Sequence, residues 1–84
     1  MNSLYHAFGL DIHTSRHAPH VYIRHAVRKW YREQGYTFRM ICLLELQVTG
    51  DEPDHSTIIH SCRVADDKHI EMVRTRAELY GITA

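Results

Sequence analysis

Apolar and polar residues alternate near the start of the chain. Over residues 4–12 every second side chain shares one face, and that face is largely apolar because it carries Leu4, Phe8 and Ile12. A period of two residues is typical of a β-strand with one buried face. The pattern therefore predicts a first strand over residues 4–12, which is weakened by Gly9.

The spacing changes to that of an amphipathic helix over residues 19–34. Pro19 suits the first helical position, where its missing N–H costs no hydrogen bond, and Gly35 suits the position just past the end. At about 100° per residue, one sector is the predicted core stripe, which contains Ile23, Ala26, Val27, Trp30 and Gln34. The opposite sector is basic and contains Arg24, His25, Arg28, Lys29 and Arg32, with Tyr22 and Tyr31 at its borders.

Alternation returns after this helix. Residues 36–49 place apolar side chains on one face from Tyr36 to Val48. Residues 50–54, with the sequence Gly-Asp-Glu-Pro-Asp, have the composition of a turn, and residues 57–64 alternate again. The two alternating segments are predicted to be the second and third strands, joined as an antiparallel hairpin.

A second helix is predicted to begin at Asp66 or Asp67, because an acidic residue there accepts hydrogen bonds from free backbone N–H groups. It is predicted to end at Gly81, and its core stripe is Ile70, Val73, Ala77 and Tyr80. The order β-α-β-β-α over residues 1–84 predicts a single two-layer α+β domain, in which both helices cover one face of a three-stranded sheet.

The length of 84 residues fits one domain, and the hydrophobic content of 44% supports a packed core. The formal net charge is zero, but residues 1–42 contain six basic and two acidic side chains, whereas residues 43–84 contain four basic and eight acidic ones. This split favours a one-sided interaction surface or self-association, with a simply solvated surface as the alternative. No apolar run approaches the length of a membrane span and no signal-peptide pattern is present, so we expect a cytoplasmic protein without membrane contact.

The basic sector of the first helix predicts one kind of partner. Its five cationic or titratable side chains could follow a phosphate backbone, and the tyrosines at its borders could stack on bases. The alternative is a solvated helix face, because the helix dipole favours cations near its C-terminal end.

Apolar side chains outside the predicted core indicate a second kind of partner. On the sheet face opposite the helices, Ile41, Leu43 and Ile59 form an apolar centre within a polar surround, as in protein–protein contact sites. On the second helix, Met72 and Leu79 lie opposite the core stripe. These five residues are the predicted partner-binding surface.

The eight histidines and two cysteines match no compact metal-binding motif. The four histidines within residues 13–25 have no acidic residue between them, and Cys42 and Cys62 lack the close spacing of zinc ligands. We expect both cysteines to be reduced and to pack as small hydrophobic groups. No glycine-rich phosphate loop and no catalytic constellation is recognisable, so the sequence predicts no catalytic residue, metal or cofactor.

These observations favour a small non-enzymatic interaction protein that inhibits, adapts or modulates a larger protein or nucleoprotein complex by occluding one of its surfaces. Self-association as a homo-oligomer is expected, and the size and class are typical of a bacterial or phage accessory protein. The alternative function is a regulator that binds the phosphates of DNA or RNA through the basic helix 19–34.

Overall fold

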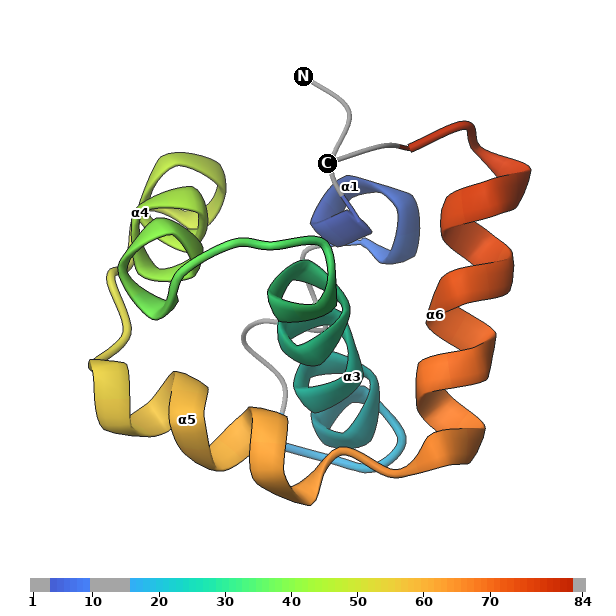
Figure 1. Cartoon of the computed structure of the whole chain (residues 1–84), viewed down its shortest axis with the longest axis horizontal. Coiled ribbons are helices and arrows are strands. Elements are labelled where there is room, and N and C mark those ends of the chain that lie inside the picture. The colour runs from blue at the N-terminus through green and yellow to red at the C-terminus, as the bar shows by residue number, and fades with distance from the viewer. Residues whose placement is uncertain (1–3, 10–15, 83–84) are drawn as a thin grey trace.

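The computed structural model describes residues 4–9 and 16–82, and within these ranges the protein contains helices but no strand (Figure 1). The five helices among the described residues are α1 (Leu4–Phe8), α3 (His20–Glu33), α4 (Phe38–Thr49), α5 (His55–Val64) and α6 (Asp67–Leu79). The predicted α+β domain with a three-stranded sheet is therefore wrong.

The two helices predicted from the sequence are confirmed as α3 and α6. α3 begins after Pro19, which is its N-cap. α6 begins where the Asp66 carboxylate accepts a hydrogen bond of 2.9 Å from the backbone N–H of His69. Both helices bury most of their predicted stripes, with the exception of Gln34 and Tyr80, which remain exposed.

The second predicted strand forms α4 because both of its ends carry helix caps. The Thr37 hydroxyl accepts a hydrogen bond of 3.1 Å from the backbone N–H of Met40, and Gly50 adopts the left-handed conformation (φ 85°) that ends many helices. The segment has apolar side chains on all sides, so it fits a helical period as well as a period of two. As a helix it buries Ile41 and Glu45, which the strand prediction placed on the polar face.

The first and third predicted strands are helical as well. α1 covers the first half of one of them, and residues 10–12 lie outside the described part of the chain. α5 forms although β-branched residues such as Thr57 and Ile58 favour strands. Complete burial of the Ile58 side chain in the core outweighs that local preference. The predicted turn at residues 50–54 joins two helices, not two strands.

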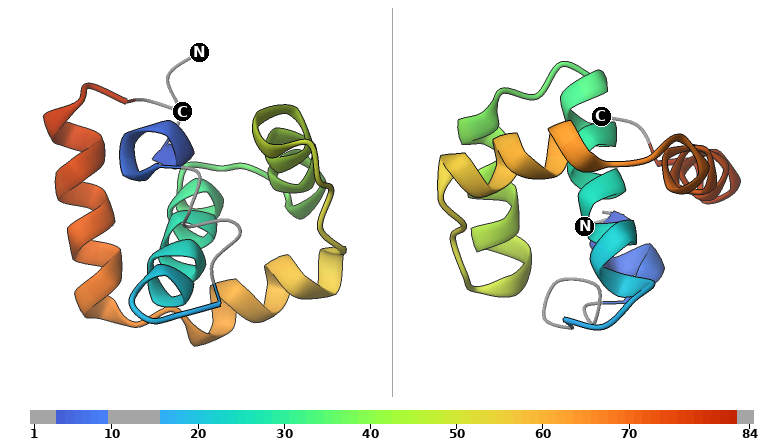
Figure 2. Two further views of the ribbon diagram at one scale, coloured as in Figure 1. Left: turned by 180° about the vertical axis from the view of Figure 1, so that it is seen from behind. Right: turned by 90° about the horizontal axis from the view of Figure 1, so that it is seen from below.

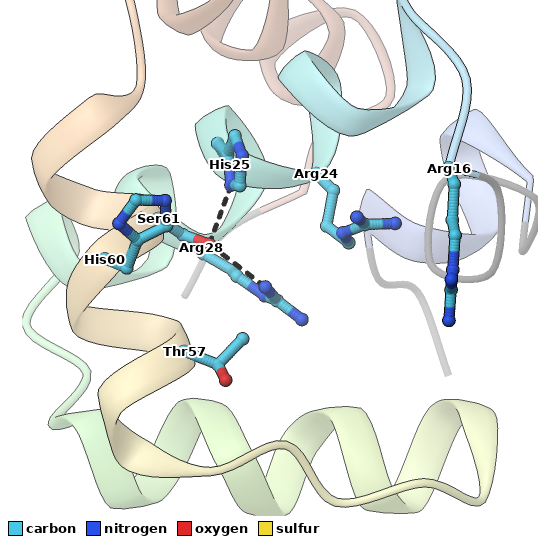
Figure 3. Close-up of a pocket in the computed structure, with 7 residues that line it drawn as sticks. All are labelled: Arg16, Arg24, His25, Arg28, Thr57, His60 and Ser61. Atoms are coloured by element: carbon cyan, nitrogen blue, oxygen red, sulfur yellow. Dashed lines mark hydrogen bonds between the residues drawn. The ribbon is translucent and has the colours of Figure 1, made fainter.

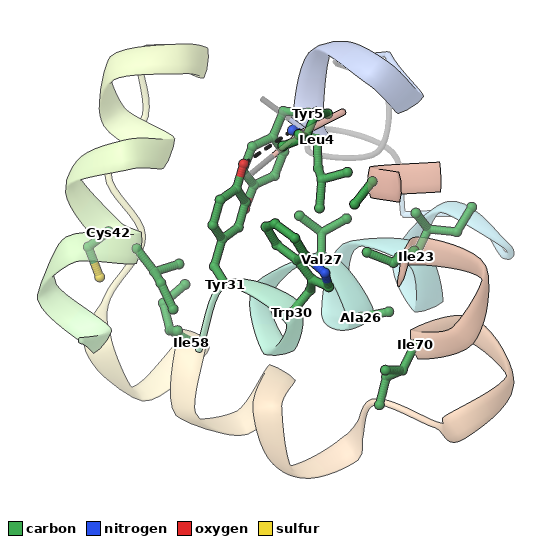
Figure 4. Packing of buried hydrophobic residues seen from close by; sticks show 14 residues of the cluster. Leu4, Tyr5, Ile23, Ala26, Val27, Trp30, Tyr31, Cys42, Ile58 and Ile70 are labelled. Atoms are coloured by element: carbon green, nitrogen blue, oxygen red, sulfur yellow. Dashed lines mark hydrogen bonds between the residues drawn. The ribbon is translucent and has the colours of Figure 1, made fainter. Parts of the chain in front are cut away.

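α3 lies at the centre of the fold, with α4 and α6 on opposite sides and α5 running across it (Figures 1 and 2). α3 contacts all three of these helices, and α1 contacts α6. Each of the five helices contributes to the hydrophobic core (Figure 4). The Tyr31 hydroxyl of α3 accepts a hydrogen bond of 3.2 Å from the backbone N–H of Leu4, which ties α1 to the centre.

A buried ion pair joins α3 to α4 within this core. Arg28 donates to both carboxylate oxygens of Glu45, at 2.8 Å from Nε and 2.7 Å from Nη2. The Tyr5 hydroxyl of α1 donates to the same carboxylate, and Arg28 Nη1 donates to Ser61 Oγ of α5 at 3.0 Å. Only 4% of Arg28 and none of Glu45 is exposed to solvent. The network links four helices and supplies partners for charges that are costly to bury.

Burial and charge act in opposite directions on this pair. Burial disfavours the charged form of Arg28, but the hydrogen bonds and the charge of Glu45 outweigh it and raise the pKa of the guanidinium. Arg28 therefore stays positively charged inside the fold, and Glu45 offsets the cost of burying this charge.

Glu45→Gln should destabilise the protein strongly, because it preserves the side-chain shape but leaves the buried Arg28 without a counter-ion. Removing one partner of a buried ion pair costs about 3–5 kcal/mol. Urea unfolding followed by the fluorescence of Trp30, the single tryptophan of the chain, measures the loss. Glu52→Gln, at an exposed position, is the matched control and should change the free energy of unfolding by less than about 0.5 kcal/mol. Equal stability of the two variants would contradict the role given to the pair.

Candidate anion-binding site

A pocket of about 330 Å³ opens between α3, α5 and the segment that precedes α3 (Figure 3). The side chains that line it are guanidinium groups, imidazoles and hydroxyls, all of which can bind an anion. They are Arg16, Arg24, His25, Arg28, Thr57, His60 and Ser61. Among the described residues, no carboxylate contributes to this lining.

Helical spacing explains why these residues meet. Residues three and four apart lie on the same side of a helix. Arg24 and Arg28 have this spacing in α3, and Thr57, His60 and Ser61 have it in α5. Since α3 packs directly against α5, the two sets line one pocket from opposite walls.

The Ser61 hydroxyl connects the pocket to the core. It accepts the hydrogen bond from Arg28 Nη1, and it lies 2.8 Å from His25 Nδ1. His25 also meets His60 edge to face, with ring centroids 5.9 Å apart. Because Ser61 is fully buried and Arg28 is held by Glu45, the position of the His25 ring is fixed by groups that belong to the fold.

The electrostatic environment of the pocket is positive. Burial lowers the pKa of His25, and the charges of Arg24 and Arg28 and the proximity of His60 lower it further. The pKa of Arg24 is likewise lowered, first by burial and then by the charge of Arg28. Burial opposes a charge of either sign, but the further lowering by Arg24 and Arg28 comes from positive charge, and that part favours an anion at the site.

An oxyanion of several oxygens matches this set of donors. Guanidinium groups bind phosphate or carboxylate through two parallel hydrogen bonds, and the hydroxyl of Thr57 can donate a further one. Glu45 offsets the charge of Arg28, and Arg16 and Arg24 add two further guanidinium groups to the lining of the pocket. An anion bound beside them would stabilise the protonated form of His25.

The structure divides the predicted nucleic-acid-binding residues into two groups. Arg24, His25 and Arg28 line the pocket, with Arg28 buried where the prediction placed it at the surface. Lys29 is half-buried. Arg32 is exposed, donates to the Tyr36 carbonyl at 3.0 Å and lies over the ring of Phe38. The basic sector is therefore not a uniform solvated face but a wall that α4 and α5 partly cover.

The predicted partner-binding residues do not form one surface. Ile41 is completely buried in the core, Leu43 is exposed on α4, and Ile59 is half-buried on α5. Met72 and Leu79 are exposed on α6 as expected, but α6 lies on the opposite side of α3 from α4. The cluster of Ile41, Leu43 and Ile59 does not form because the prediction placed these residues on adjacent strands of a sheet, and the described residues form helices instead.

Four residues of the pocket were missing from the sequence prediction: Arg16, Thr57, His60 and Ser61. The last three follow a helical spacing that was obscured by treating residues 57–64 as a strand. Arg16 precedes α3, and only the three-dimensional structure brings it to the pocket.

The cysteines and histidines do not form a metal centre in the described part of the chain. Within it, no group of three His, Cys, Asp or Glu side chains is close enough to hold a metal ion; His13 lies outside the described residues. Cys42 and Cys62 are both free thiols, and burial raises the pKa of each. Raised thiol pKa values make both groups less reactive at neutral pH.

Comparison with known proteins gives no further assignment. No protein-family model matches the chain, and no curated protein or solved structure shows significant similarity to it. Across the described residues, every helix is too short or too polar to cross a membrane.

The pKa of His25 should lie below its ordinary value of 6.5 in the free protein, because burial and the neighbouring cations oppose its protonation. NMR titration of the imidazole signals measures this value. Arg24→Gln should raise the pKa of His25 by removing a cation, whereas Lys68→Gln, an exposed position on α6, should leave it unchanged. A His25 ring that titrates at or above 6.5 in the parent protein would refute the positive potential.

Proposed function

We propose that this protein is a non-enzymatic nucleic-acid-binding protein that holds a backbone phosphate in the pocket between α3 and α5. The observation that carries the proposal is the lining itself, in which arginine, histidine and hydroxyl side chains converge and, among the described residues, no carboxylate takes part. A concave site of this kind provides several charge-assisted hydrogen bonds to one phosphate group.

The two helices that build the pocket favour a polyanion over a small isolated anion. α5 contains no acidic residue and carries His55, His60 and Arg63. The one acidic residue of α3, Glu33, forms an ion pair of 2.9 Å with Arg74 of α6. Lys29 and Arg32 on α3 and Arg63 on α5 are further cations outside the pocket, which suits a partner whose negative charges repeat.

Base stacking contributes little in this proposal. Tyr31 is buried in the core, and the exposed Tyr22 packs against His69 of α6 at a ring distance of 5.4 Å. With its two predicted stacking residues engaged elsewhere, recognition rests on phosphates. The affinity should therefore depend strongly on salt and only weakly on base sequence.

Inhibition or modulation of a larger protein by surface occlusion remains a hypothesis, but it now ranks second. Its predicted contact surface is dispersed, since Ile41 lies in the core and α4 and α6 occupy opposite sides of the fold. The phosphate proposal depends instead on residues that the structure brings together.

Arg16→Gln combined with Arg24→Gln should weaken binding to a fluorescently labelled single-stranded oligonucleotide by about tenfold or more. Each phosphate contact that is lost should also reduce the slope of log affinity against log salt by about 0.7. Fluorescence anisotropy over a salt series measures both quantities. Lys68→Gln combined with Arg74→Gln removes the same formal charge from exposed positions on α6, outside the pocket, and is the matched control.

The proposal is contradicted by flat anisotropy at low salt. It is also contradicted if the control variant loses as much affinity and salt dependence as the pocket variant, because the charge would then act without a specific site.

A further inference from the structure

α4 has an outer face that is mainly apolar and remains exposed to solvent. Its residues recur at helical spacing: Arg39, Met40, Leu43, Leu46 and Gln47 are all exposed. Leu43 has an exposed fraction of 42%, although leucines more often lie inside a protein. A helix that is apolar on both its inner and its outer face is typical of one that is covered on both sides.

Exposed positions of α4 have the spacing of a helix–helix seam. Met40, Leu43 and Gln47 follow one another at intervals of three and four residues, as in contacts between paired helices, and Tyr36 directly precedes the N-cap of the helix. Together with Leu44 they line a shallow groove of about 320 Å³ along α4. The twelve residues of α4 span about 18 Å, and the seam positions from Met40 to Gln47 cover about two helical turns.

The charges at the two ends of α4 oppose its own dipole. Arg39 lies in the first turn, where the helix dipole is positive, and Asp51 and Glu52 directly follow the end, where it is negative. A single helix is stabilised by the reverse arrangement. No acidic residue lies in the first turn of α4 and no basic residue in its last.

An antiparallel second copy of α4 would offset both unfavourable ends. Arg39 of one chain would meet Asp51 and Glu52 of the other, and symmetry would repeat this contact at the opposite end. The two helix dipoles would also run in opposite directions. The same patch would thus complement itself, as a twofold symmetric interface requires.

We infer that α4 is a self-association surface, through which two copies of this chain pair with their α4 helices antiparallel. One helix pair covers less area than the ~800 Å² per partner of a standard stable interface, so the dimer should be concentration-dependent. This inference is independent of the phosphate pocket, which lies between α3 and α5.

Sedimentation equilibrium tests the pairing directly. The parent chain should shift from 9.9 kDa towards twice that mass as concentration rises. Leu43→Glu should weaken association at least tenfold by placing a charge in the seam. Leu79→Glu is the matched control, because Leu79 is 75% exposed on α6, and it should leave association unchanged. Helical circular dichroism of each variant confirms that the fold is intact.

Charge reversal tests the orientation. Arg39→Glu alone, and Asp51→Lys with Glu52→Lys in a second variant, should each weaken association. Combining all three changes in one chain should restore it, because the antiparallel contacts then become attractive again. A parallel pair would still oppose like charges in that combined variant.

A parent chain that stays at 9.9 kDa at every concentration overturns the inference. The inference is also overturned if the Leu43→Glu variant associates as strongly as the Leu79→Glu variant. Failure of the combined charge variant to recover association overturns the antiparallel arrangement.

Discussion

The ion pair between Arg28 and Glu45 joins α3 to α4, and its hydrogen-bond network also includes α5, so it constrains both helices that line the candidate pocket. A chain of this size buries limited apolar surface, and two charges within its core are stable only if all of their polar atoms are satisfied. Tyr5 and Ser61 complete that set, so α1, α3, α4 and α5 take up a defined arrangement. The hydrogen bond between Ser61 and His25 then fixes the position of the His25 ring at the pocket wall. The same contacts thus stabilise the fold and hold Arg28 and His25 of the candidate site in place.

The parts of the fold that could be predicted from the sequence are those with unambiguous local signals. α3 and α6 combine a stripe of apolar residues with boundary residues such as Pro19 and Asp66, and both helices are confirmed. The predicted strands failed where an apolar segment fits two periods at once. In α4, the caps at Thr37 and Gly50 decide in favour of the helix. Both cap residues can be seen in the sequence, but the prediction gave more weight to the alternation of apolar and polar residues over 36–49.

The candidate site was predictable only in part. Basic residues of α3 were singled out, and Arg24 and His25 do line the pocket. The burial of Arg28 could not be predicted, because its charge is compensated by a carboxylate seventeen residues away along the chain. The contribution of Ser61 likewise depends on how α5 crosses α3. Such contacts follow from tertiary packing, which cannot be read from the periodicity of neighbouring residues along the chain.

NMR titration with a short single-stranded oligonucleotide tests whether a nucleic-acid phosphate binds in the pocket between α3 and α5. The side-chain signals of Arg16, Arg24 and His25 should shift on binding, while that of Lys68 on α6 should not. The bound phosphate should also raise the pKa of His25, since its negative charge stabilises the protonated ring. Shifts that centre on α6, with the pKa of His25 unchanged, would show that the phosphate does not bind in this pocket.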